Sequence, residues 1–254
     1  MKIKSTSISK NLVSFKTKSN NKYRMFCFPH AGGSSSFFHS WAEKLENIGI
    51  ELVAIQLPGR EKRINENLYL EMDKIISDLV DEIVKYTDKP FLFFGHSLGG
   101  MISYELCKEL CKEDKPLPLH LIISSCRVPH LTKVKKSVHD LSDDELAEKL
   151  KILNGSPEFI LKNKDFQELY FPMIRADFSI AESYHSNEFY RLPIDISCFL
   201  GDHDTVSEAD VLGWEEYTLK KFNYQLFNGD HFYLKENTEE IINYVEQITN
   251  YIKV

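Results

Sequence analysis

Short apolar runs alternate with longer helical patterns along most of this chain, and this alternation limits the fold more than any other feature. The runs are rich in β-branched and aromatic residues and almost wholly apolar, as expected of strands buried on both faces of a sheet. We expect strands at 25–28, 50–55, 91–94, 119–124, 194–200 and 223–227. Amphipathic patterns between them predict helices at 36–47, 70–87, 98–113, 207–220 and 238–252. Strands that alternate with helices predict a mostly parallel central sheet flanked by helices on both sides.

One long stretch, from about 128 to 191, interrupts the alternation, because its pattern predicts helices and no strand. Ser142 and Glu145 have the spacing of a capping box at a helix start. Pro157 can open a second helix, and Asp165 can cap a third. An insertion of this length exceeds a simple crossover between two strands. We therefore expect a helical lid over the sheet.

The N-terminal residues differ in composition from the remainder. The first 24 contain seven Lys or Arg and no acid, and no apolar run of the length found in secretory signals. We expect residues 1–22 to form a flexible tail and residues 23–254 to form a single domain that carries the lid.

Composition excludes several classes of function. A net charge of −7 argues against nucleic-acid binding, since no pervasive basic surface would face the phosphates. No apolar stretch approaches the ~18 residues that a membrane-spanning helix needs. The five cysteines lack the spacing of a metal site, so we expect free thiols in a reducing cytosol.

The strongest chemical motif is Gly95-His96-Ser97-Leu98-Gly99, a G-x-S-x-G sequence between a predicted strand and a predicted helix. In this context the motif is typical of a nucleophile elbow, a sharp turn that exposes the serine hydroxyl. Glycines are needed because side chains on either side of so tight a turn would collide. We expect Ser97 to be a catalytic nucleophile.

A serine nucleophile needs a base held by a third group, and in folds with this elbow the chain order is serine, acid, histidine. The acid should follow the strand after the lid, where Asp202 and Asp204 both stand. We favour Asp204, because the fourth residue of a G-x-x-D turn returns over the sheet edge; Asp202 remains the alternative. His231 is the best candidate for the base, since it follows the last predicted strand.

An oxyanion hole requires two backbone N–H groups aimed at the developing negative charge. One should come from Leu98, the residue after the nucleophile. The loop after the first core strand, Pro29 to Gly33, should supply the second, and its two glycines allow close approach to a substrate. Ala31 is our choice of donor.

These motifs resemble, in order along the chain, those of the type II thioesterases that accompany non-ribosomal peptide and polyketide synthases. The segments that carry the resemblance are Phe28 to Gly33, Gln56 to Glu61, Phe94 to Gly100, Arg175 to Asp177, Gly201 to Asp204 and Gly229 to Phe232. The resemblance covers the chain from Tyr23 onward. It implies an α/β-hydrolase fold with a helical lid, and it places the family's nucleophile, acid and base at Ser97, Asp204 and His231.

The resemblance also implies a stand-alone cytoplasmic hydrolase that removes acyl groups from the phosphopantetheine arm of carrier proteins. We expect a monomer that needs neither a metal nor an organic cofactor. Two other enzymes could use the same triad: a small-molecule carboxylesterase or lipase, and an acyltransferase in which an amine or alcohol replaces water. A hydrolase-fold binding protein is disfavoured because all three triad residues are present.

Two surfaces should matter for such a substrate. Apolar lid residues could line an acyl pocket, namely Phe159, Phe166, Leu169, Tyr170, Phe171, Met173 and Phe178. Carrier domains are usually acidic, so a local basic patch would have to overcome the negative net charge. The two candidate patches are Lys133, Lys135 and Lys136, and Arg60, Lys62 and Arg63.

Overall fold

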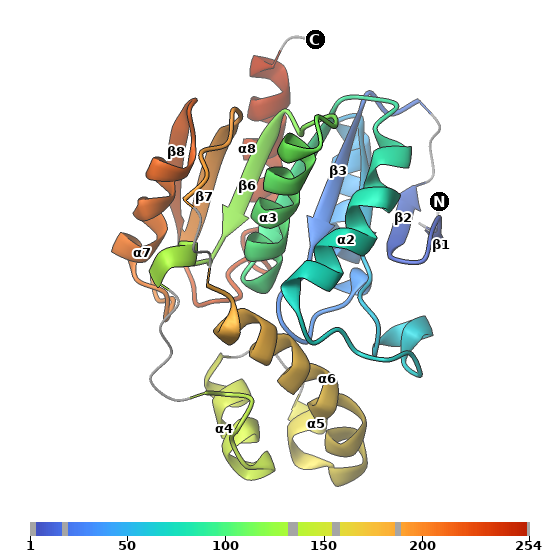
Figure 1. Cartoon of the computed structure of the whole chain (residues 1–254), viewed down its shortest axis with the longest axis vertical. Coiled ribbons are helices and arrows are strands. Elements are labelled where there is room, and N and C mark those ends of the chain that lie inside the picture. Colours follow the sequence, from blue (N-terminus) through green and yellow to red (C-terminus); the bar gives the residue numbers. More distant parts are fainter. Residues whose placement is uncertain (1–3, 17–19, 132–136, 154–157, 186–188, 253–254) are drawn as a thin grey trace.

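An eight-stranded sheet in the order β1-β2-β4-β3-β5-β6-β7-β8 forms the centre of the protein (Figure 1). The computed structural model describes residues 4–16, 20–131, 137–153, 158–185 and 189–252. The strands are β1 Lys4–Ser7, β2 Leu12–Lys16, β3 Tyr23–Phe28, β4 Ile50–Ile55, β5 Phe91–His96, β6 His120–Ser124, β7 Asp195–Gly201 and β8 Phe222–Phe227. Pairings from β4 through β8 are parallel, whereas β1 and β2 are antiparallel. The predicted α/β fold, with its mostly parallel sheet, is confirmed.

Helices cover both faces of this sheet, so its central strands are buried along their whole length. The helices are α1 Ala42–Asn47, α2 Met72–Ile83, α3 Leu98–Lys112, α7 Glu208–Leu212 and α8 Thr238–Tyr251. One core cluster joins the sheet to α2, α3 and α7, and a second joins it to α1 and α8. Figure 1 shows α2 and α3 in front of the sheet and α8 behind it.

Several predicted helices have shorter α-helical cores than the pattern suggested, because 3-10 turns form one end. Residues 36–47 divide into the 3-10 helix η1 (Ser35–Trp41) and α1. Residues 207–220 likewise divide into α7 and η5 (Gly213–Tyr217), and η3 (Val84–Tyr86) follows α2.

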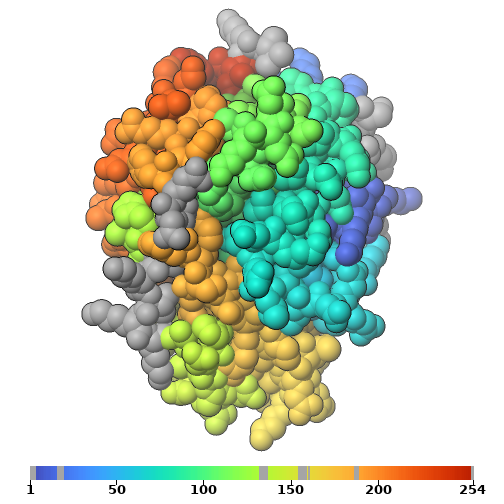
Figure 2. Space-filling model, in the orientation of Figure 1, coloured from blue at the N-terminus to red at the C-terminus, as the bar shows by residue number. Residues whose placement is uncertain are grey.

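The described residues between 128 and 191 contain helices and no strand, as predicted for the lid. The three α-helices are α4 Asp143–Leu153, α5 Glu158–Lys162 and α6 Lys164–Ser183. Figure 1 places them beyond the end of the sheet toward which the parallel strands point. In the view of Figure 2 they form a continuous mass at that end of the molecule. Buried side chains of α4 and α6 pack against each other in a small core of their own: Leu146, Leu150, Phe171, Met173 and Ile174.

The helix starts within the lid agree only in part with the sequence. The Ser142 hydroxyl accepts a bond from the Glu145 N–H, and Glu145 accepts one from the Ser142 N–H, so the capping box forms. The cap of α6 is Asn163, not Asp165: its side chain accepts bonds from the N–H groups of residues 165 and 166. The predicted start at Pro157 lies outside the described residues.

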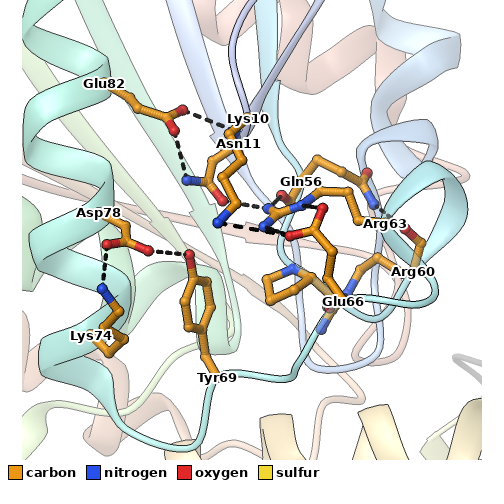
Figure 3. A network of polar contacts seen from close by, with 11 residues as sticks. Lys10, Asn11, Gln56, Arg60, Arg63, Glu66, Tyr69, Lys74, Asp78 and Glu82 are labelled. Atoms are coloured by element: carbon orange, nitrogen blue, oxygen red, sulfur yellow. Dashed lines mark hydrogen bonds and ion pairs between the residues drawn. The ribbon is translucent and has the colours of Figure 1, made fainter.

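Residues 1–22 are not a flexible tail where the structure describes them, so that prediction was wrong. The strand β2 pairs antiparallel with β4, and Leu12 and Phe15 on it are 0% and 2% exposed. Between β1 and β2, Asn11 donates to the Glu82 carboxylate of α2 from both its backbone N–H (2.9 Å) and its side chain (3.0 Å) (Figure 3). Arg63 donates to Asn11 from the other side. The N-terminal segment is thus an integral edge of the sheet.

Two further sequence expectations concern cysteines and membranes. The five cysteines are free, and four of them are buried. Within the described part of the chain, every helix is too short or too polar to cross a bilayer.

Candidate active site

Ser97 occupies a sharp turn between β5 and α3, with backbone angles φ 55° and ψ −118°. A side chain at Gly95 would lie 2.2 Å from the carbonyl oxygen of Gly99, and one at Gly99 would lie 2.0 Å from that of Phe28. Neither position can hold a larger residue, which is the reason for the two glycines. The strained turn forms the elbow that the motif predicts and leaves Ser97 at the wall of a cavity.

The structure distinguishes between the two candidate acids. His231 Nδ1 donates to Asp204, at 2.9 Å from Oδ1 and 3.1 Å from Oδ2. Asp202 faces another way: it accepts a bond from the Gly229 N–H at 2.8 Å and pairs with the exposed His203. The structure therefore brings His231 and Asp204 together and leaves Asp202 as a support of the turn before His231.

The environment of Asp204 keeps its carboxylate ionised. Burial raises the pKa of Asp204, but the hydrogen bond and charge of His231 and the Val206 N–H lower it, and the net pKa lies below the ordinary value. A buried carboxylate that is hydrogen-bonded to Nδ1 fixes the imidazole tautomer and leaves Nε2 free to take a proton.

Two more histidines adjoin His231 and stay neutral. Burial lowers the pKa of His96 well below 6.5, helped by the charge of His231, and burial and nearby cations lower the pKa of His30 to about 3. The His96 ring lies 5.0 Å from that of His231, and its Nδ1 bonds the Ser124 hydroxyl at 2.9 Å. His96 therefore packs beside His231 as a neutral side chain and is not a second base.

The loop after β3 forms a tight turn beside Ser97. The Gly33 N–H donates to the His30 carbonyl at 2.8 Å, and Gly32 has φ +76°. An i to i+3 bond with a left-handed third residue is the arrangement of a type II turn, which favours glycine at that position. Ala31, Gly32 and Leu98 all line the cavity. The residues of the two proposed oxyanion donors thus line the same cavity as the nucleophile, with Leu98 as the first residue of α3.

A cavity of about 720 Å³ extends from Ser97 and His231 toward the lid. Its lid-side walls are largely aliphatic and include residues from α4 and α6. Of the lid residues predicted to line it, Tyr170, Met173 and Phe178 do so. Phe171 is buried in the lid core instead, and Phe159, Phe166 and Leu169 are exposed. The volume and lining suit an acyl chain.

Neither predicted basic patch is supported as a docking surface. Lys133, Lys135 and Lys136 lie outside the described residues. Arg60 and Arg63 are 3% and 6% exposed and form buried hydrogen bonds, so of the second group only Lys62 is on the surface (Figure 3). Tertiary burial of the two arginines overturns that interpretation.

Sequence reasoning missed the partners of Arg60. Its guanidinium forms a two-pronged ion pair with Asp177 of α6, at 2.8 Å for each contact, and it also donates to the Gly33 carbonyl at 2.9 Å. Both residues belong to motifs that support the family resemblance, but they are 117 positions apart. The motifs alone give no sign that the two side chains meet.

Within the described ranges, no group of three or more His, Cys, Asp or Glu side chains could hold a metal ion. The absence of a cofactor remains a prediction.

A serine on a strained strand-to-helix turn that shares a cavity with a histidine held by a buried carboxylate is the arrangement of a serine hydrolase of the α/β-hydrolase class. The chain belongs to the Thioesterase domain family, whose family model matches residues 23–249. It is therefore a thioester hydrolase, and the resemblance to type II thioesterases is confirmed.

Curated relatives match nearly the whole chain. The gramicidin S biosynthesis protein GrsT of Aneurinibacillus migulanus is 34% identical over 239 residues, which cover 94% of this chain and 93% of that protein. The medium-chain S-acyl fatty acid synthase thioesterase of Homo sapiens is 34% identical over 239 residues, covering 91% of this chain and 86% of its own length.

A solved structure agrees in fold. BorB, described as the type II thioesterase from the borrelidin biosynthetic cluster, superposes with a TM-score of 0.87 at 28% identity, covering 96% of this chain and 99% of its own. The correspondence therefore extends over essentially the whole molecule, lid included.

Proposed function

We propose that this thioesterase hydrolyses acyl groups from the phosphopantetheine arm of carrier proteins in a peptide or polyketide synthase, through an acyl-serine at Ser97. The observation that carries the proposal is that His231, held by Asp204, lines the same largely apolar cavity as Ser97. The relatives named for gramicidin S biosynthesis and for the borrelidin cluster support the carrier-linked substrate.

In the first step Ser97 Oγ attacks the thioester carbonyl carbon while its proton passes to His231 Nε2. Ser97 and His231 line the same cavity, and in sites without substrate the hydrogen bond between nucleophile and base often tightens only on binding. The carbonyl π electrons move to the oxygen. The resulting oxyanion would accept hydrogen bonds from the N–H groups of Ala31 and Leu98. Collapse of this intermediate breaks the C–S bond, and the leaving thiolate takes the proton from His231.

The second step repeats the first with water. His231 removes a proton from water, the resulting hydroxide attacks the acyl-serine, and Ser97 leaves with the proton returned by His231. Asp204 stabilises the imidazolium in both steps. Every proton and electron pair is supplied by these three side chains, the substrate and water, so we propose a reaction without a metal or an organic cofactor, carried out by a monomer in the cytoplasm.

Hydrolysis of a short-acyl carrier protein, compared with that of an oxygen ester of the same acyl group, tests the proposal. We expect the wild type to release the acid from the carrier and Ser97→Ala to lose activity by about 10⁶-fold. Cleavage of the free ester that depends on Ser97, without release from the carrier, would overturn the carrier-linked substrate. Formation of an ester or amide product would indicate an acyltransferase.

A further inference from the structure

The turn that carries the proposed oxyanion donor is bonded to the lid. Asp177 Oδ2, on helix α6, accepts a hydrogen bond from the backbone N–H of Gly32 at 2.7 Å. The same oxygen accepts from Arg60 at 2.8 Å, and Asp177 is 3% exposed. The two residues joined by the Gly32 bond are 145 positions apart in the chain.

A type II turn can change to type I by rotation of its central peptide unit, here the one between Ala31 and Gly32. That rotation would swing the Gly32 N–H away from Asp177. Because a short bond to a charged acceptor is among the stronger hydrogen bonds of a protein, Asp177 opposes the rotation. Arg60 restrains the peptide unit between Gly33 and Ser34, at the end of the turn, through the Gly33 carbonyl.

The donor itself lies in the preceding peptide unit. The His30 carbonyl points into the turn, where it accepts from the Gly33 N–H. In a trans peptide the N–H and C=O groups point in opposite directions, and the described chain has no cis peptide bond. The Ala31 N–H therefore points out of the turn. Ala31 itself lines the cavity. The position of this N–H also depends on where the turn lies, and the bond from the neighbouring Gly32 N–H to Asp177 holds the turn in place.

We propose that Asp177 is a positioning residue for the oxyanion hole, which fixes the position of the Ala31 N–H through Gly32, and that Arg60 is the counter-ion that holds the Asp177 carboxylate in place. This inference rests on the proposed role of Ala31. It assigns α6 a part in catalysis beyond covering the cavity, since a lid helix supplies the acceptor that holds the catalytic turn.

Two double variants isolate the Gly32 bond. Arg60→Met with Asp177→Asn, and Arg60→Met with Asp177→Leu, both remove the ion pair and leave no unpaired buried charge. Only the asparagine keeps an oxygen that can accept from Gly32. We expect the asparagine variant to retain kcat within about 3-fold, and the leucine variant to lose about 10-fold or more with an unchanged KM, since a full donor is worth more still.

The affinity for an oxyanion distinguishes a positioning role from a merely structural one, because loss of a structural contact alone would not change it. An alkyl trifluoromethyl ketone forms an oxyanion on the serine, and its affinity should fall in the leucine variant in proportion to kcat. The affinity of the matching alcohol, which forms none, should not change. Equal kcat and equal ketone affinity in the two folded variants would overturn the proposal.

Melting temperatures establish that both variants are folded. If the leucine variant does not fold, Asp177→Asn and Asp177→Ser give the same comparison, because both leave Arg60 charged and the serine hydroxyl is too short to reach Gly32. Rates are measured on a small acyl-cysteamine thioester and on a nitrophenyl ester. A wild type inactive on thioesters but active on the ester would refute the proposed function, and the Asp177 comparison would still be decided on the ester.

Discussion

Asp204 and His231 form a hydrogen bond of 2.9 Å in which the carboxylate is wholly buried and the imidazole lines the cavity. Asp202, two positions earlier in the same turn, is joined instead to the surface residue His203. The two aspartates can therefore be compared directly, since they lie in the same loop and have the same side chain but contact different residues.

Asp204→Asn should lower kcat by about 10⁴-fold, because an amide in place of the carboxylate favours the wrong histidine tautomer. Asp202→Asn, the matched control, should stay within a few-fold of the wild type. Steady-state rates on one thioester substrate decide the question. Comparable losses in both variants would contradict the assignment of the acid to Asp204.

Leu12→Ala should lower the free energy of unfolding by about 2–5 kcal/mol, because Leu12 is fully buried against the core. Ser5→Ala, at an exposed position of β1, should change it by less than about 0.5 kcal/mol. Urea titrations of the two variants give the difference. A negligible effect of Leu12→Ala would mean that the N-terminal segment is not part of the folded domain.

Leu150→Phe should shift acyl preference toward shorter chains. Leu150 is a buried residue of α4 that lines the cavity, so a larger side chain there reduces the space for the acyl group. We expect kcat/KM for an octanoyl thioester to fall about 10-fold relative to that for acetyl. Ile152→Phe, on the same helix but 69% exposed, should leave the ratio unchanged. An unchanged ratio in both variants would place the acyl chain elsewhere.

Stability should fall as the pH decreases below about 6.5. Burial lowers the pKa of His30 to about 3, that of His120 to about 4 and that of His96 well below 6.5. They are neutral in the folded state, whereas the unfolded chain binds protons near pH 6.5. Between about pH 6 and 4 the unfolded state therefore binds about three more protons, and each lowers the free energy of unfolding by about 1.4 kcal/mol per pH unit.

Urea unfolding at several pH values measures this slope. His120→Gln should reduce it by about a third, because one of the three imidazoles with a lowered pKa is gone. A slope that is the same in the variant and the wild type would contradict the assignment.

The parts of the structure that the sequence predicts best are those set by local pattern. The alternation of strands and helices gave the sheet and its two helical layers, and the elbow glycines and the Ser142 capping box formed where their spacing indicated. Periodicity and turn chemistry act within a few residues, so a single sequence contains enough information for them.

Long-range pairings account for what the sequence did not predict. The basic composition of residues 1–22 resembles a tail, and nothing near Asn11 reveals that it bonds Glu82 on a distant helix. The burial of Arg60 follows from Asp177 in the lid, so its charge suggested a surface patch that does not exist. The choice between two nearby aspartates likewise depends on where His231 lies in space.

The strand β1 also affects whether two molecules of the protein can pair through the edges of their sheets. All its side chains are exposed, and its sequence, Lys-Ser-Thr-Ser, is polar throughout. An open strand edge is a template on which another chain can add, and natural proteins discourage this with short, polar or charged edge strands. If the chain began at Tyr23, the apolar strand β4 would be the edge, and its backbone groups would be free to pair between molecules. The N-terminal hairpin therefore protects this edge of the sheet from pairing between molecules.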